Sequence, residues 1–460
     1  MNLASKNQPR RRSVAPSPLA SSQRARSVGA VRANRIQPNQ PAAPHKLAAW
    51  CGIAVVLLYF LRGTVLPWFL NISNFALIIA NILALTAAAS IAVFGAGRWR
   101  ITWALVLLTF AAGVGQAVQF NNSAQRLFGL TLLIISFGPL VVNPATVAMR
   151  AAAWRLVVQG LPWLAGVFVV WYALRLPNFG AGFFSGFMNQ CMIAGPLAGM
   201  GGAIALIRAF DNRSWKWGLL AAFSIIPVLA SGSRVATLAT AATYCFIIIR
   251  RKPALGVLGS LFLAIAIVAF ITQPETSTDT SSMTGALVNK GTVNTRAELW
   301  ASRIAEFKSS PLFGIGVAMG TGSGSEVETG GNIRVEPGSS YLAILAMTGF
   351  LGTLAFFTAL GLLLNKYVRL NPSVDLQILS AMGIFLAVHG VAEGWVLAFG
   401  SPLAFLFWLW LGKVGDAVAQ PVRARSMKTL RGRRSEVGGQ GAGGRGWCGP
   451  APGVGLAGKN

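Results

Sequence analysis

Arginines and carboxylates gather in one polar stretch of an otherwise apolar chain, between about residues 273 and 339. This stretch holds seven of the twelve acidic residues: Glu275, Asp279, Glu298, Glu306, Glu326, Glu328 and Glu336. It also contains Arg296 and Arg303, whose spacing of seven places them near one face of a helix. Guanidinium groups bind phosphate through paired, charge-assisted hydrogen bonds, and a carboxylate can accept the proton of a hydroxyl. The stretch therefore contains the residue types needed for phosphate recognition and proton transfer.

A helix is predicted to begin at Arg296, because Thr295 and Glu298 have the spacing of a capping box. Pro311 ends the segment. The apolar residues of this helix form one stripe: Trp300, Ile304 and Phe307. Two interpretations stay open. The helix lies on the membrane with its arginines reaching to headgroups, or the arginines bind a phosphate of the substrate.

Arg234 and Glu336 are the next candidates. Arg234 follows Ser231-Gly232-Ser233 between two apolar runs. It is an interfacial anchor or an anion-binding residue, since a Gly/Ser break leaves backbone amides free. Glu336 precedes a helix expected from about Ser340, so it either caps that helix or acts as a general base.

His389 and Glu393 are four residues apart and share a helix face. Either they hydrogen-bond to a neighbouring helix, or Glu393 pairs with an arginine of the site. No metal is expected. The stretch from Gly320 to Gly331 is explained by Gly/Ser flexibility, and the chain's four cysteines and two histidines have no zinc-site spacing.

Composition defines the class of protein. Hydrophobic residues make up 54% of the chain, charged residues 11%, and the mean hydropathy is +0.59. Soluble domains need about a quarter charged residues, so most of this surface must face lipid. The net charge of +27 does not indicate nucleic-acid binding, because the basic residues lie in two tails and in short loops between apolar runs.

The predicted fold is all-α, a polytopic transmembrane bundle of about 12 spans, with 10 or 11 also possible. The apolar runs lie at about 47–62, 74–94, 101–120, 127–143, 156–174, 188–207, 217–230, 235–249, 254–272, 340–364, 375–392 and 395–412. The domain is expected over residues 47–412, with a loop at 273–339 between spans 9 and 10. Residues 1–46 and 413–460 are expected to be disordered, basic, cytoplasmic tails.

The distribution of basic residues predicts the orientation. With the N-terminus inside, the inner loops carry Arg98, Arg100, Arg150, Arg155, Arg208, Arg213, Lys216, Arg250, Arg251, Lys252, Lys366 and Arg369. The outer short loops carry Arg62, Arg126, Arg175 and Arg234. Twelve against four agrees with the positive-inside rule. Both termini are therefore expected in the cytoplasm and the long loop outside.

Several short motifs together resemble the O-antigen ligase and polymerase superfamily of bacterial membrane proteins, most clearly over residues 231–352. They are Ser233-Arg234, Arg296 with Trp300, the run from Pro311 to Gly316, and Tyr341-Leu342 with Gly349 and Gly352. Ligases of this superfamily often carry a His-Asn pair just before the Tyr-Leu motif, and the resemblance implies a catalytic role for that His. At these two positions this chain has Gly338 and Ser339. The polysaccharide polymerase branch therefore fits better than a lipopolysaccharide ligase.

The resemblance implies a glycosyltransferase of the bacterial inner membrane that acts on its external face, in O-antigen or exopolysaccharide synthesis. The donor would be an oligosaccharide on a polyprenyl (undecaprenyl) diphosphate, and the acceptor a glycan or glycolipid. Arg234, Arg296 and Arg303 would bind the diphosphate, with Arg296 also acting in catalysis and Glu336 as base. Supporting residues would be Trp300, Tyr341, His389 and Glu393, and no cofactor is implied. The alternative is a multi-span transporter or flippase of a glycolipid or another anionic substrate.

Overall fold

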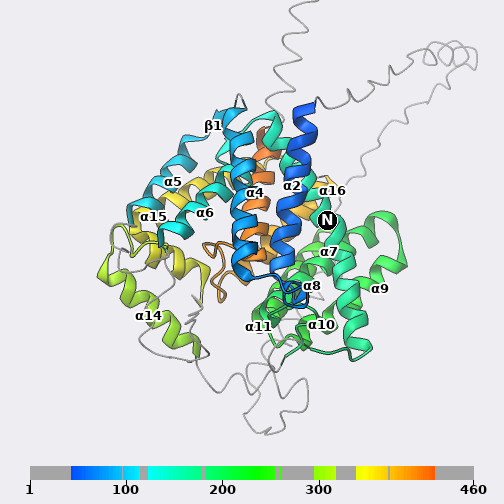
Figure 1. The fold of residues 1–460 in the computed structure, drawn as a ribbon. Coiled ribbons are helices and arrows are strands. Elements are labelled where there is room, and N and C mark those ends of the chain that lie inside the picture. The colour runs from blue at the N-terminus through cyan, green and yellow to red at the C-terminus, as the bar shows by residue number, and fades with distance from the viewer. Residues whose placement is uncertain are drawn as a thin grey trace, which may run out of the picture. The chain divides into compact units, whose positions relative to one another are not determined.

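The protein is an all-helical bundle. The computed structural model describes residues 43–95, 97–113, 123–178, 183–253, 260, 295–317, 338–370 and 373–419. The helices there are α2 (Ala43–Arg62), α3 (Leu66–Phe69), α4 (Asn74–Phe94), α5 (Ile101–Ala112), α6 (Ser123–Ser136), α7 (Pro144–Ala173), α8 (Cys191–Asn212), α9 (Trp215–Phe223), α10 (Ile225–Ala230), α11 (Arg234–Arg251), α14 (Thr295–Ser309), α15 (Ser340–Tyr367), α16 (Val374–His389) and a last helix, Pro402–Ala419. In these residues the named strands are a two-residue pair, β1 (Arg98–Trp99) and β2 (Val141–Val142). The all-α prediction is confirmed (Figure 1).

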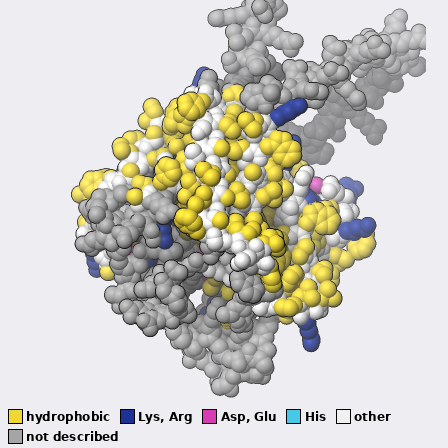
Figure 2. Space-filling model, viewed as in Figure 1, with side chains coloured by type: hydrophobic (Ala, Val, Ile, Leu, Met, Phe, Trp, Pro, Cys, Tyr) yellow, Lys and Arg dark blue, Asp and Glu magenta, His cyan; other side chains and the backbone are white. Residues whose placement is uncertain are grey.

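Five helices of the described part are long and apolar enough to cross a membrane. They are Phe75–Phe94, Pro144–Ala173, Cys191–Asn212, Ser340–Tyr367 and Pro402–Ala419. Shorter apolar helices cover Ile101–Ala112, Arg126–Ser136, Trp215–Ala230 and Val374–His389. Hydrophobic side chains cover much of the face shown in Figure 2. These helices have the length and composition of a membrane-embedded protein. The count of about 12 spans stays a prediction.

Some expected segments lie outside the described residues. These are residues 1–42, the apolar run at 254–272 apart from Ser260, most of the expected external loop, and residues 420–460. At the limits of the expected domain, α2 begins at Ala43 rather than at residue 47, and the last helix continues past residue 412 to Ala419.

Polar residues start the helices where the sequence changes from loop to apolar run. Ser73, Ser233, Ser339 and Ser373 each accept a hydrogen bond from a first-turn backbone N–H of their helix. Asn143 forms a reciprocal capping box with Thr146 at the start of α7. Such caps pair amide groups that a helix leaves without internal partners. They fix where each span begins and therefore which residues lie at its ends.

Antiparallel packing brings the candidate residues to one end of the bundle. Helices α11 and α16 pack together, and Arg251 at the end of α11 donates to Gln377 near the start of α16 at 2.5 Å. Arg234 and His389, at the other ends of these helices, therefore lie toward the opposite end. The Ser340 N–H that opens α15 donates to Gly390 O at 2.9 Å. We call the end that contains Arg234, Ser340 and His389 the loop end.

The opposite end, here called the basic end, contains Arg251, Arg150 and Arg100. At this end Arg251 also pairs with Asp211 at the end of α8. Helix α8 runs antiparallel to α7, since Arg208 near its end bonds Val158 O at 3.0 Å and the Phe168 ring stacks on Phe187, just before α8. The start of α7, which carries Arg150, therefore lies at the basic end.

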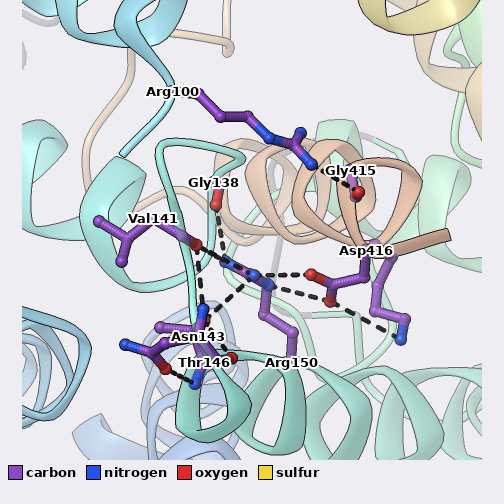
Figure 3. Close-up of polar contacts among 9 residues, drawn as sticks. Arg100, Gly138, Val141, Asn143, Thr146, Arg150, Gly415 and Asp416 are labelled. Carbon is purple, nitrogen blue, oxygen red and sulfur yellow. Dashed lines mark hydrogen bonds and ion pairs between the residues drawn. The ribbon is translucent and has the colours of Figure 1, made fainter. Parts of the chain in front are cut away.

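Arg150 ties the last helix to the start of α7 (Figure 3). Its Nε and Nη2 donate hydrogen bonds to the two carboxylate oxygens of Asp416, at 3.1 and 2.7 Å, and both side chains are fully buried. Its remaining donors reach backbone carbonyls, including Gly138 O at 2.8 Å and Val141 O at 3.1 Å. Arg100 Nη2 donates to Gly415 O at 2.7 Å. Burial, and next the charge of Arg150, lower the pKa of Arg100, while Asp416 opposes the shift.

The segregation of these residues agrees with the orientation expected from the sequence. Arg100, Arg150, Arg208 and Arg251 belong to the expected inner loops and lie at the basic end. Arg62 and Arg234 belong to the expected outer loops. Arg62 lies beside Asn189, whose Nδ2 donates to Arg62 O at 3.3 Å just before α8 begins. Which end faces the cytoplasm stays a prediction.

Candidate functional site

Helix α14 turns its charged face inward at the loop end. Arg303 and Glu306 are buried, with 1% and 8% of their surface exposed. Trp300 and Ile304, from the predicted apolar stripe, are 37% and 43% exposed. The helix therefore exists, beginning at Thr295, one residue before the predicted Arg296. Of its apolar stripe, Trp300 and Ile304 face away from the protein, and Phe307 is half-buried. This is opposite to a helix on a soluble protein, whose apolar face packs on the core.

Arg303 and Glu306 form an ion pair one helical turn apart. Arg303 Nη1 donates to Glu306 Oε2 at 2.6 Å. The Nε and Nη2 groups of Arg303 are buried and have no hydrogen-bond partner among the residues that the structure describes. Buried charged groups usually have all their donors paired, because losing the hydrogen bonds of water costs several kcal/mol. The guanidinium thus presents one nitrogen to Glu306, while its Nε–Nη2 edge has no partner in the described part of the chain.

Arg150 shows what this second edge can do. Its Nε–Nη2 edge holds the two oxygens of Asp416 in a bidentate pair. In Arg303 the same two nitrogens have no partner in the described chain. Both arginines are fully buried. Arg150 is therefore neutralised by a protein carboxylate along its fork-shaped edge, whereas Arg303 keeps that edge available for an anionic oxygen pair.

The segment after α14 is inserted into a break in α15. Gly349 has non-helical dihedral angles (φ 63°, ψ −170°) inside α15. Ile315 N and Gly316 N donate to Ala346 O and Met347 O at 3.0 and 2.9 Å. In return, Phe350 N donates to Pro311 O at 2.8 Å and Leu351 N to Leu312 O at 3.2 Å. Backbone groups freed by the break are thus paired by the Pro311–Gly316 segment, which fixes α14 against α15.

The start of α15 is held to the chain around it. Trp300 Nε1 donates to Gly338 O at 3.2 Å, and Tyr341 OH donates to Ala387 O at 2.7 Å. Ser340 Oγ donates to Glu393 O at 2.6 Å and accepts from Trp395 N at 3.1 Å. These contacts make Trp300 and Tyr341 structural links at the loop end.

His389 is buried beside the same helix start. Its Nδ1 accepts from Trp395 Nε1 at 2.8 Å, and its ring stacks on Phe385 with ring centroids 5.8 Å apart. Because Nδ1 is the acceptor, a neutral imidazole carries its proton on Nε2. Glu393 is also buried, 4% exposed. The hydrogen bond of His389 to the 390–401 segment supports the structural interpretation of this residue.

Arg234 opens α11 directly after a sharp turn. Gly232 has φ +65°, and a Cβ there would lie 3.0 Å from Phe183 Cγ, so the turn requires glycine. Ser233 caps the helix, accepting from Ala236 N at 3.2 Å. Arg234 itself is exposed. It shares the loop end with Arg303, but α11 packs mainly on α8 and α16, whereas α14 packs on α15.

Residues 219–357 match the family model of the O-antigen ligase. Over these residues the chain is similar to the O-antigen ligase and polymerase superfamily. The resemblance found in the motifs is thereby confirmed, and it makes this a membrane protein of a family of glycosyltransferase-like enzymes of O-antigen synthesis. No individual curated protein matches the chain. The matched residues include Arg234, Arg303 and the inserted segment, whereas His389 and Glu393 lie beyond them.

The structure shows what Gly338 and Ser339 do at the start of α15. Gly338 has φ +70°, and a Cβ there would lie 3.0 Å from Leu299 Cβ. Ser339 caps α15. The position is thus occupied by a left-handed turn packed against α14.

The structure does not test the roles predicted for two site residues, Arg296 and Glu336. The side chain of Arg296 and all of Glu336 fall outside the described part of the chain. Glu306, by contrast, was not singled out from the sequence, yet the structure places its carboxylate on Arg303. The spacing of three residues between Arg303 and Glu306 is the signal that could have indicated this pair.

Proposed function

We propose that this protein transfers or polymerises an oligosaccharide carried on a polyprenyl diphosphate, at the external face of a bacterial inner membrane. One observation supports this most directly: the buried guanidinium of Arg303, whose Nε–Nη2 edge has no partner among the described residues. A diphosphate offers paired anionic oxygens that match this edge. The O-antigen ligase match covers the same helix and provides the reaction class.

The proposed reaction is a displacement at the anomeric carbon of the donor. The acceptor hydroxyl oxygen forms the new C–O bond, and the bond from that carbon to the diphosphate oxygen breaks with its electron pair leaving on the diphosphate. The hydroxyl proton passes to a base, for which Glu336 is the residue proposed from the sequence. Arginines at the diphosphate stabilise the charge that develops on the leaving group.

Glu306 has a positioning role in this proposal. Its ion pair with Arg303 Nη1 fixes the plane of the guanidinium and partly neutralises it. The remaining edge is held ready for the diphosphate, so little side-chain freedom is lost on binding. Arg234 and Arg296 are proposed to bind the same group from α11 and from the first turn of α14.

The proposal is tested by transfer activity in membranes. The donor is the lipid-linked oligosaccharide pool extracted from a strain that lacks the gene, and the product is glycan released from the lipid. Arg303→Lys at wild-type protein level is expected to lose more than tenfold in rate, since a hydrogen bond to a charged group contributes about 1.5–3 kcal/mol. Lys308→Arg, on an exposed position of the same helix, is the matched control. Unchanged activity of Arg303→Lys would contradict the role of Arg303.

Deletion of the gene separates the branches of the superfamily. Long glycan chains that collapse to single repeat units indicate a polymerase, which the sequence favours. Long chains that accumulate on the carrier lipid indicate a ligase. An unchanged glycan profile in the deletion strain would contradict the proposed function altogether.

A further inference from the structure

We propose that the segment Leu312–Gly316, which belongs to the polar stretch between two spans, re-enters the membrane and presents Leu312 and Phe313 to the acyl chains of the bilayer. This concerns how the domain sits in lipid, and it does not depend on the reaction proposed above. It means that the expected external loop 273–339 is not external throughout.

Two helices independently indicate the depth of this segment. Gly349, which the segment contacts, lies nine residues after Ser340 and so about 14 Å along α15 from the loop end, at 1.5 Å per residue. Gly113 lies 12 residues after Ile101, about 18 Å along α5 from the basic end. A Cβ on Gly113 would meet Phe313 O at 2.7 Å and Gly316 N at 2.9 Å. Since the hydrocarbon core is about 30 Å thick, both measures place the segment within it.

The surface around the segment is continuous with the apolar flank of a candidate span. Leu312 is 56% and Phe313 39% exposed. Phe350 and Leu354 of α15 are each 53% exposed, and Leu351 37%. The backbone N–H of Leu351 donates to Leu312 O in the segment, and that of Phe350 to Pro311 O just before it. Acyl chains that cover these α15 side chains would therefore also cover Leu312 and Phe313. Figure 1 shows α14 and α15 on the same flank of the bundle, and the two helices pack against each other.

The backbone of the segment meets the main requirement for irregular structure at such depth. In hydrocarbon, an unpaired N–H or C=O costs several kcal/mol, so non-helical chain is tolerated only where protein satisfies it. The break at Gly349 supplies this pairing, since three hydrogen bonds join the segment to residues 346–351 and a fourth joins the preceding Pro311 O to Phe350 N. Gly314 N also donates to Ser310 O at 2.9 Å.

Spin labels measure the depth without any glycan substrate. Cys51, Cys191, Cys245 and Cys448 are replaced by Ser in the full chain. Single cysteines are then introduced as Leu312→Cys and Phe313→Cys, with Leu354→Cys as the lipid control and Arg175→Cys, exposed just after the loop end of α7, as the aqueous control. The labelled proteins are placed in vesicles of phosphatidylethanolamine and phosphatidylglycerol. Accessibility to oxygen and to a polar nickel chelate is compared by power saturation.

The expected result is an oxygen-to-nickel accessibility ratio at both segment positions that matches Leu354→Cys and exceeds Arg175→Cys severalfold. A ratio at Leu312→Cys and Phe313→Cys equal to that of Arg175→Cys would overturn the proposal. The two segment variants are read independently, so poor folding of one leaves the other decisive. Loss of transfer activity in either variant has no bearing on this result, which keeps the test separate from that of the proposed function.

Discussion

Gly314 and Gly349 lie so close that neither can carry a side chain. A Cβ on Gly314 would lie 2.5 Å from Gly349 N, and a Cβ on Gly349 would lie 2.5 Å from Gly314 N. Both residues have positive φ, 73° and 63°. The Pro311–Gly316 run and the glycine of the following helix, which carry part of the family resemblance, are thus two halves of one backbone contact. Their chemical role is to place α14, with Arg303, against α15.

Substitution of either glycine by alanine is expected to unfold this contact. Gly314→Ala and Gly349→Ala each combine a left-handed backbone with a clash against backbone atoms that cannot rotate away. Together these cost at least about 3 kcal/mol. The control is Gly361→Ala in the same helix, where a Cβ would meet nothing within 4 Å and helix propensity favours alanine by about 1 kcal/mol. Thermal unfolding of the purified proteins in detergent compares them, and equal melting temperatures would contradict the contact.

The Arg150–Asp416 pair is expected to be a strong structural link. Arg150→Met leaves Asp416 buried without its bidentate partner, and breaking a buried pair from one side costs about 3–5 kcal/mol. Arg155→Met, at an exposed position on the same helix, should change stability by no more than about 0.5 kcal/mol. Thermal unfolding in detergent again measures the difference. The double variant with Asp416→Leu should recover part of the loss, because Asp416 is then no longer buried without Arg150, although Lys413 Nζ loses its contact with Asp416 Oδ2 at 3.9 Å.

Local patterns predicted much of the fold, and long-range contacts account for what they did not predict. The capping-box spacing predicted a helix from Arg296, and α14 begins one residue earlier, at Thr295. Helices also occupy most of the described apolar runs. The pairing of Arg150 with Asp416 joins residues 266 apart in the chain, which no local pattern encodes. The break in α15 at Gly349 was not predicted from the sequence either, because a glycine inside an apolar run has no neighbours that signal a break.

At the candidate site, too, the sequence predicted one residue of an ion pair and not its partner. Arg303 was identified from its spacing to Arg296 and from the family motifs. Its partner Glu306 was not, because the stripe of Trp300 and Ile304 draws attention to the opposite face of the helix. In a soluble protein that stripe would face the core. Beside a lipid bilayer the preference reverses, and the charged face turns to the protein.

Topology is expected to follow the basic residues. Cysteines introduced as Ser281→Cys and Ser435→Cys in the background without native cysteines are exposed to an impermeant thiol reagent on intact cells. The prediction that both termini are cytoplasmic and the polar stretch begins outside requires labelling at 281 and not at 435. Permeabilised cells, in which both should react, serve as the control. The reverse pattern in intact cells would reject the orientation and the external location of the reaction with it.

Arg234 and Arg296 are expected to bind the donor diphosphate by geometry as well as by charge. Alanine at either position should lower transfer by more than tenfold, since a hydrogen bond to a charged group contributes about 1.5–3 kcal/mol. Lysine keeps the charge but not the planar fork, so its rate should fall between alanine and wild type. The double alanine variant should lose less than the sum of both effects if the two residues grip one group. Protein levels should stay near normal for Arg234, which is exposed.

The competing interpretation, that these arginines only anchor the protein to headgroups, makes a different prediction. Lysine snorkels as well as arginine, so anchoring predicts full activity of both lysine variants. Arg175→Lys provides the matched control, because Arg175 is an exposed arginine on another of the expected outer loops and has no proposed role. Transfer from the extracted lipid-linked oligosaccharide, measured at matched protein level, separates the two cases. Full activity of Arg234→Lys and Arg296→Lys together would end the assignment of these residues to the diphosphate, whereas a selective loss relative to Arg175→Lys supports it.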